Sequence, residues 1–239
     1  MKAKQDLDKV FGAAGERIEQ EVSALLGKNF VVSEPTTELI GKEDFFERLS
    51  GKKVIFRLKI EGQVETEGYL LVSLADAIRI GGTLIMLPSA ELAEVIERQE
   101  YNEELQDSYG EIANIMAGSL TSSFEENYRK SIRLIRKTQE VITPIKVDVE
   151  SDVPCPNGTY YLVTSKMSMG EESMGEFHLL LPGMPFGLVE PPPKPVEKEV
   201  VSEAGEPGTV ETTEVSPEVT GQEEKDVRPA EGMTEPPDL

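Results

Sequence analysis

Three polar side chains, Asp107, Glu111 and Asn114, are spaced so that one helix would present them together. Residues at positions i, i+4 and i+7 share a helical face, and with Gly118 they fall within a sector roughly 60° wide. A carboxylate can pair with a cation, and an amide can both donate and accept hydrogen bonds. Because glycine has no side chain, Gly118 would let a partner's backbone approach closely. The spacing therefore predicts a recognition or catalytic face.

The apolar residues of the same segment cluster on roughly the opposite side of the helix. They are Leu105, Ile112, Ile115, Met116 and Leu120. We expect this stripe to be buried and the polar stripe to face outward. Simple solvation is the ordinary explanation for polar residues on an outer face, so the functional interpretation depends on the rest of the chain.

The elements that would position this helix occur twice in the first 188 residues. Each unit shows the patterns of a long helix, a strand and a two-stranded hairpin. The helices are predicted at 6–26 and 102–128, the strands at 29–33 and 140–148, and the hairpins at 53–73 and 159–181. Helices at 74–87 and 89–99 connect the units. We expect an α+β fold, with an antiparallel sheet and two long helices on one face.

Similar offsets support a duplication within this folded part. Pro35 and Pro144 are 109 positions apart, and Gly68 and Gly175 are 107 positions apart. The two pseudo-repeats are predicted to span about 1–88 and 89–188.

The last part of the chain, residues 189–239, has a different composition. It carries 14 acids and 4 bases, is rich in proline and glutamate, and has no aromatic residue. Such a segment cannot bury enough apolar surface to offset the cost of ordering. We predict a disordered acidic tail that serves solubility or tethering.

Charge and rare residues exclude several classes of function. The 239 residues carry a net charge of −21, which disfavours nucleic acid and anionic membrane surfaces as partners. One cysteine and one histidine, Cys155 and His178, exclude an intramolecular disulfide and a structural zinc site. The chain shows no signal peptide and no apolar run of about 18 residues, so a cytoplasmic location is predicted.

The segment Asp107-x3-Glu111-x2-Asn114 resembles the signature of the CheC/CheX/FliY family of chemotaxis phosphatases, and the duplicated architecture is similar to that family over roughly residues 6–183. In the family a proline follows the signature after roughly 22 residues. Here 29 residues separate Asn114 from Pro144, and we place the extra ones around 128–137. Counting back from Pro35 puts Gly12 and Lys9 at the Asn and Glu positions of the first unit. The chain thus resembles single-site CheX-type members.

The resemblance implies hydrolysis of the aspartyl-phosphate of a CheY-type response regulator. Asn114 would orient the attacking water, and Glu111 would pair with a lysine of the regulator. Asp107 and Gly118 would contact the partner. The chain would need no cofactor of its own, because the regulator carries the Mg²⁺. A second copy of the chain or a CheD-type deamidase are further expected partners.

Two other interpretations stay open at this point. One is a non-catalytic adaptor that binds receiver domains or flagellar-switch components, since the first unit keeps the architecture without the signature residues. The other is a helix-and-sheet domain unrelated to signalling. An adaptor would have no need to keep Glu111 and Asn114 together on an exposed face.

Overall fold

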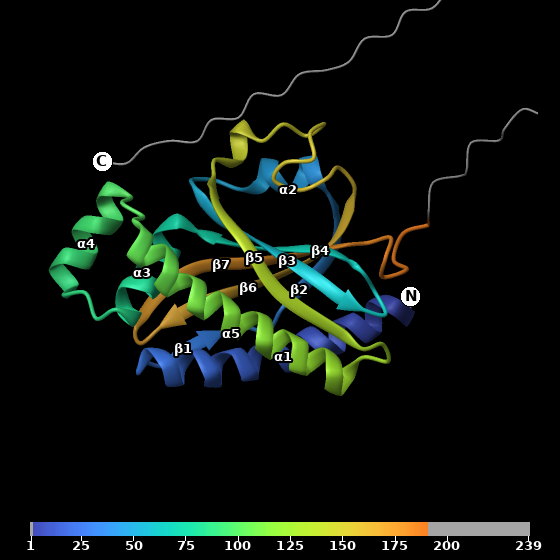
Figure 1. Cartoon of the computed structure of the whole chain (residues 1–239), viewed down its shortest axis with the longest axis horizontal. Coiled ribbons are helices and arrows are strands. Elements are labelled where there is room, and N and C mark those ends of the chain that lie inside the picture. Colours follow the sequence, from blue (N-terminus) through green and yellow to red (C-terminus); the bar gives the residue numbers. More distant parts are fainter. Residues whose placement is uncertain (1, 191–239) are drawn as a thin grey trace, which may run out of the picture. The chain divides into compact units, whose positions relative to one another are not determined.

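A computed structural model of the chain describes residues 2–190, so the predicted tail lies almost entirely outside the described residues. The described part is α+β, with five α-helices and one antiparallel sheet of seven strands (Figure 1). The helices are α1 (Lys2–Leu26), α2 (Lys42–Arg48), α3 (Leu74–Leu84), α4 (Ser89–Arg98) and α5 (Glu103–Asn127). The strands are β1 (Phe30–Val32), β2 (Thr36–Gly41), β3 (Lys53–Gly62), β4 (Thr66–Ser73), β5 (Ile132–Ile142), β6 (Thr159–Met169) and β7 (Glu172–Pro182).

The sheet joins the two halves of the sequence by exchanging their edge strands. Its order is β1-β6-β7-β4-β3-β5, and β2 also pairs with β6. The hairpins β3–β4 and β6–β7 meet at the centre, where β4 pairs with β7. The edge strands from the first half border the second hairpin, and β5 from the second half borders the first. Neither half has a complete sheet without the other.

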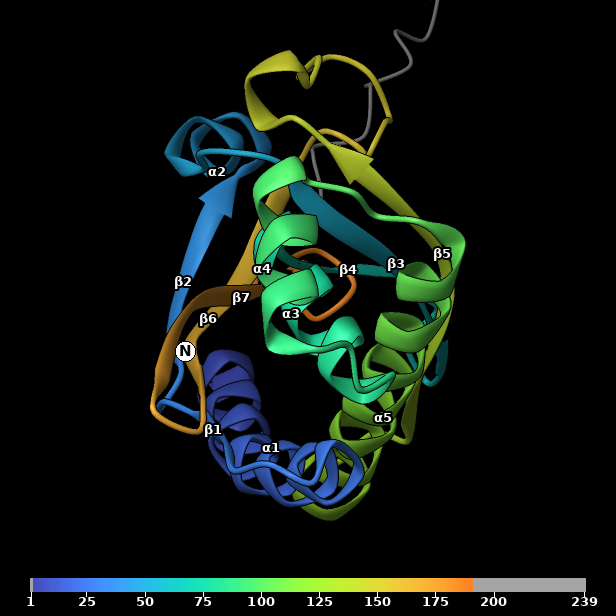
Figure 2. The same cartoon turned by 90° about the vertical axis from the view of Figure 1, so that its left-hand side faces the viewer.

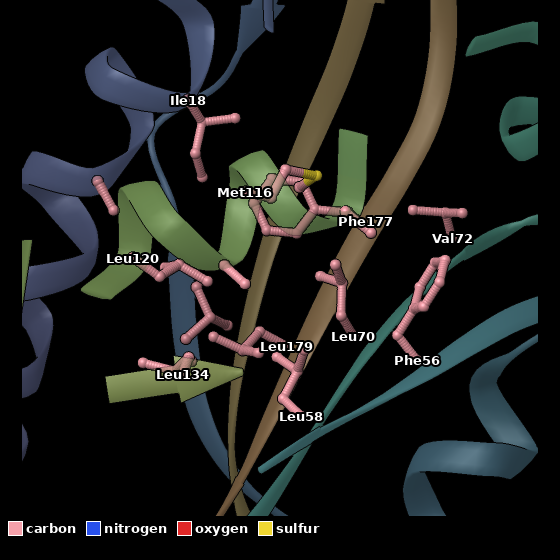
Figure 3. Close-up of a cluster of buried hydrophobic side chains, with 14 of the residues drawn as sticks. Ile18, Phe56, Leu58, Leu70, Val72, Met116, Leu120, Leu134, Phe177 and Leu179 are labelled. Carbon is pink, nitrogen blue, oxygen red and sulfur yellow. The ribbon is translucent and has the colours of Figure 1, made fainter. Parts of the chain in front are cut away.

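The two long helices, α1 and α5, lie side by side on one face of the sheet (Figure 2). Both are amphipathic, and their apolar stripes pack with the sheet and α3 into one core. Figure 3 shows this core, where Met116 and Leu120 of α5 and Ile18 of α1 face Leu70 and Leu179 of the central strands.

The opposite face of the sheet is covered by the short helix α2 and the 3₁₀ turn at Pro144–Lys146. Phe45 and Phe46 of α2 pack there with Tyr69 and Tyr160. This second, smaller core lies on the face of the sheet away from α1 and α5. Among residues 2–190, the helices are too short or too polar to span a membrane.

The edge strands differ most from the sequence-based expectation. The strand predicted at 29–33 is present as β1, but β2 and α2 follow it and were not expected. The prediction of a strand at 140–148 is wrong. The observed strand β5 ends at Ile142, and Pro144 begins the 3₁₀ turn. Edge strands bury few residues and therefore show weak hydrophobic patterns. In β5, arginine and lysine side chains interrupt the apolar pattern.

The duplication is visible in the burial of α1 and α5, at a constant offset of 102 positions. Leu7, Val10, Phe11, Ala14, Ile18 and Val22 of α1 match Tyr109, Ile112, Ala113, Met116, Leu120 and Phe124 of α5, and all twelve are buried. The same offset relates buried Phe30 and Val32 of β1 to buried Ile132 and Leu134 of β5. The helix and the edge strand that follows it thus keep the same spacing in both halves.

This offset corrects the predicted match between Pro35 and Pro144. The residue 102 positions after Pro35 is Lys137, and 22 residues separate it from Asn114. The extra residues expected around 128–137 are therefore not an insertion, because β5 already begins at Ile132. Lys137 occupies the position of the family's proline.

Candidate functional site

The outer face of α5 carries the predicted stripe. Asp107, Glu111, Asn114 and Gly118 are all exposed, whereas Ser108, Ile112 and Met116 between them are buried. The helix begins after Asn102, whose side chain accepts a hydrogen bond from the Leu105 N–H at 3.0 Å and caps it. The buried stripe fixes the rotation of α5, so the four positions face outward together.

The side chain of Asn114 is held by an arginine of the neighbouring edge strand. Arg136 of β5 donates a hydrogen bond from Nε to Asn114 Oδ1 at 2.7 Å. A guanidinium has only donors, so the carbonyl of the amide must face Arg136. The amide NH₂ group of Asn114 is thereby left to face a partner.

Arg136 is in turn supported from two sides. Its guanidinium lies 5.6 Å from the ring centroid of Phe56, in a cation–π contact. It also packs on α5 at Gly110, where a Cβ atom would lie 3.0 Å from Nη1 and 3.2 Å from Cζ. A helical glycine costs about 1 kcal/mol relative to alanine, and here it makes room for the guanidinium.

Next to Asn114 the surface between α5 and β5 is hollowed. A hollow of about 340 Å³ is lined by Asn114, Ala117, Gly118, Thr121, Arg133, Leu134, Ile135 and Arg136. No acidic side chain is among these residues, although the whole chain is strongly acidic. At Gly118 a Cβ atom would meet nothing within 4 Å, so the glycine is not required by contacts in residues 2–190. The charged side chains that line the hollow are those of Arg133 and Arg136.

The corresponding face of α1 has the same exposure but different residues. At the offset of 102, Lys9 stands for Glu111, Gly12 for Asn114 and Glu16 for Gly118, and all three are exposed. Counting back from Pro35 therefore reaches equivalent positions. The first unit presents the surface without an acid at the position of Glu111 and without an amide at the position of Asn114.

The histidine packs beside Phe45 of α2 and does not lie on α5. His178 is buried in β7, and its Nδ1 lies 3.1 Å from Thr164 Oγ1. Burial, together with the charge of Lys53, lowers the pKa of His178 to about 4, so the ring is neutral at pH 7. Within residues 2–190, no group of three or more His, Cys, Asp or Glu side chains is placed to hold a metal ion.

Sequence reasoning missed Arg136 and Gly110. Two signals were available. Residues 129–137 carry five bases and no acid in a chain of net charge −21, and Gly110 interrupts the buried stripe of a predicted helix. The long-range pairing of β5 with β3, which brings Arg136 beside α5, has no local signature.

The fold is similar to that of FliY and of the FliM middle domain. FliY from Thermotoga maritima matches with a TM-score of 0.65 and 17% identity, over 78% of this chain and 92% of that one. The FliM middle domain from H. pylori matches with a TM-score of 0.60 and 9% identity, over 79% and 98%. A chain of the FliG–FliM complex from H. pylori matches with a TM-score of 0.60 and 10% identity, over 76% and 93%.

No protein-family model and no curated protein sequence matches the chain. The structural likeness nevertheless confirms the expected resemblance to the CheC/CheX/FliY family at the level of the fold.

Proposed function

We propose that this chain hydrolyses the aspartyl-phosphate of a CheY-type receiver domain with residues of α5. The observation that supports this most is the exposed face of Asp107, Glu111, Asn114 and Gly118, with the Asn114 amide fixed in one orientation by Arg136. An amide held this way can orient a water molecule without changing its own protonation state. A solvated helix face has no need of a fixed amide.

The chemistry requires a water held in line with the phosphorus atom. The Asn114 NH₂ group donates a hydrogen bond to one lone pair of this water and leaves the other for the attack. As the water oxygen bonds to phosphorus, the bond between phosphorus and the aspartate oxygen breaks. The products are inorganic phosphate, which keeps both protons of the water, and a free carboxylate on the receiver. Mg²⁺ belongs to the receiver in this scheme, and it neutralises charge on the phosphoryl oxygens.

The other residues of the face contribute to docking. Glu111 lies one turn before Asn114 and pairs with the regulator's lysine, which fixes the register of the two proteins. Asp107 extends the acidic contact by a further turn. Gly118 lets the partner's backbone approach the hollow between α5 and β5.

The test is the decay of a phosphorylated CheY-type receiver from the same organism, measured with the wild-type chain and with Asn114→Ala. The wild type should accelerate the decay. Asn114→Ala should remove the acceleration, while its unfolding free energy stays within about 0.5 kcal/mol of wild type because the side chain is exposed. A well-folded wild-type chain that accelerates the decay of none of these receivers would overturn the proposal.

The alternative is an adaptor that binds a receiver domain or a flagellar-switch component without turnover. The likeness to the FliM middle domain, and to a chain of a FliG–FliM complex, favours this class of partner. Binding of the phosphorylated receiver with unchanged decay would establish the adaptor. A second copy of the chain and a CheD-type deamidase stay predictions as partners.

A further inference from the structure

Side chains link α5 to the free edge of β5 at three levels. Thr121 Oγ1 accepts a hydrogen bond from the Leu134 N–H at 3.0 Å. Asn114 accepts the one from Arg136, and Gln139 Nε2 donates to the Gln106 carbonyl at 3.1 Å. The three helix positions are spaced by about two turns each. The Asn114–Arg136 link is thus the middle one of a regular series.

The first unit keeps the two outer links at the same offset of 102 positions. Glu19 Oε1 accepts a hydrogen bond from the Val32 N–H at 2.7 Å, which corresponds to the bond between Thr121 and Leu134. Lys4 Nζ donates to Thr37 Oγ1 at 2.7 Å, which corresponds to the link between Gln106 and Gln139. The outer links therefore join a helix to edge strands in both halves, α5 to β5 and α1 to β1 and β2.

The middle link exists in the second unit alone. The positions that correspond to Asn114 and Arg136 are Gly12 and Glu34, and Gly12 has no side chain to accept a bond. The edge strand of the first unit is held without it, so the fold does not require the Asn114–Arg136 bond. The Asn114–Arg136 link is present in the unit that carries Glu111 and Asn114 on its outer face.

The surroundings of Arg136 also differ from those of a stabilising ion pair. Within residues 2–190 no carboxylate lies within 4.0 Å of its guanidinium. Phe56 and Gly110 hold it in place instead. The position that corresponds to Gly110 in the first unit is Asp8, which bonds Thr37 and Tyr161. In the second unit Gly110 has no side chain, and the Arg136 guanidinium occupies the space that a side chain would need.

We infer that Arg136 is a positioning residue of the proposed phosphatase site, which holds the Asn114 amide with its NH₂ group toward the phosphorylated receiver. The inference rests on the proposed function. A free amide samples two flipped orientations and several rotamers, and only one of them presents the donor to the water. Arg136 removes the others before the receiver binds. Lysine cannot replace it, since it has no donor at the position of Nε.

The decisive experiment compares Arg136→Ala and Arg136→Lys with Lys137→Ala, which removes the same charge from the next position of the same strand, at a residue that does not line the hollow beside Asn114. Receiver decay is measured at varied receiver concentration to separate kcat from KM. We expect both Arg136 variants to lower kcat about 10- to 100-fold, since a misplaced catalytic group costs rate of this order, with KM changed less than about threefold. Lys137→Ala should leave kcat unchanged.

Two further readouts distinguish positioning from a structural role. Methylguanidinium in solution should restore part of the rate of Arg136→Ala and none of Asn114→Ala. In the Asn114→Ala background, adding Arg136→Ala should leave the affinity for the phosphorylated receiver unchanged, because the arginine acts through the amide. A tenfold weaker affinity of the double variant, or equal kcat values for Arg136→Lys and wild type, overturns the inference.

A measurement without activity separates this inference from the proposed function. In ¹⁵N relaxation of the free protein, the Asn114 side-chain NH₂ should be as ordered as the α5 backbone, and Arg136→Lys should lower its order parameter. An equally ordered amide in Arg136→Lys contradicts the inference even if the chain proves to be a phosphatase. A wild-type chain without phosphatase activity contradicts the proposed function, whatever the amide does.

Discussion

The helices α1 and α5 carry the same buried residues in the same places and different residues on their outer faces. Six buried positions of one match six of the other at an offset of 102, and both helices hold an edge strand with the same two outer links. On the outer face of α1, Lys9 occupies the position that Glu111 has on α5, and Gly12 occupies the position of Asn114. The buried half of each helix is what the fold requires. The outer half of α5 is free to serve a partner.

The strand exchange explains why the first unit persists without the signature residues. Its edge strands complete the sheet around the second hairpin, and its hairpin is completed by β5. Arg136 is therefore placed beside Asn114 by a strand of the first unit, β3, with which β5 pairs. The first unit acts as a scaffold for the second.

Among the changes that compare the two helices, the largest loss of kcat/KM is expected when Glu111 of α5 is replaced by lysine, the residue at the equivalent position of α1. Glu111→Lys places a cation where the proposed function needs a carboxylate opposite the regulator's lysine. Juxtaposed like charges cost several kcal/mol, so kcat/KM for the phosphorylated receiver should fall by about 100-fold or more. Receiver decay at limiting receiver concentration measures this ratio.

The matched control is Lys9→Glu on α1, which makes the opposite change on the equivalent surface. It should leave kcat/KM within about twofold, since Lys9 is exposed on the other helix and salt screens exposed charges. Equal losses from both substitutions would mean that the receiver does not distinguish the helices, and the site would not be confined to α5.

A smaller effect is expected from Gly110→Ala. The added methyl group would lie 3.0–3.3 Å from the Arg136 guanidinium, which must shift by a few tenths of an ångström. We expect kcat to fall by about three- to tenfold because the arginine no longer holds Asn114 in place. Circular dichroism should show an unchanged helix content. Wild-type kcat in a folded Gly110→Ala variant would show that the position of the guanidinium does not matter.

The sequence predicted the parts of this site that lie within one element. The outer stripe of α5, the two long helices and both hairpins follow from periodicity, which records burial locally. The edge strands were predicted poorly because β2 and β5 bury few residues and contain polar side chains. Arg136 could not be predicted as a partner of Asn114, since its place depends on the pairing of β5 with β3, where Arg136 lies opposite Leu58, 78 positions earlier in the chain.

The two outer links should behave alike in both units. Thr121→Val and Glu19→Met each remove the side-chain acceptor of an edge-strand N–H, that of Leu134 or that of Val32. Each should lower the unfolding free energy by about 1 kcal/mol, the usual net value of one hydrogen bond. Urea denaturation measures the loss, and kcat should be unaffected. A kcat loss from Thr121→Val as large as that from Arg136→Ala would show that the Thr121–Leu134 link also positions the site and is not only structural.

The smallest effect separates stability from docking at two exposed helical glycines, Gly12 and Gly118. A Cβ atom at either position meets nothing within 4 Å, so alanine should raise the unfolding free energy by about 0.5–1 kcal/mol in both helices. Only Gly118→Ala should raise KM for the phosphorylated receiver, by about fivefold, since a methyl group forced into a close contact costs at least about 1 kcal/mol. Denaturation and receiver-decay assays on the two variants give both quantities. An unchanged KM in Gly118→Ala, with the expected gain in stability, would show that the partner does not approach α5 at Gly118 and would confine the docking surface to the turns that carry Asp107, Glu111 and Asn114.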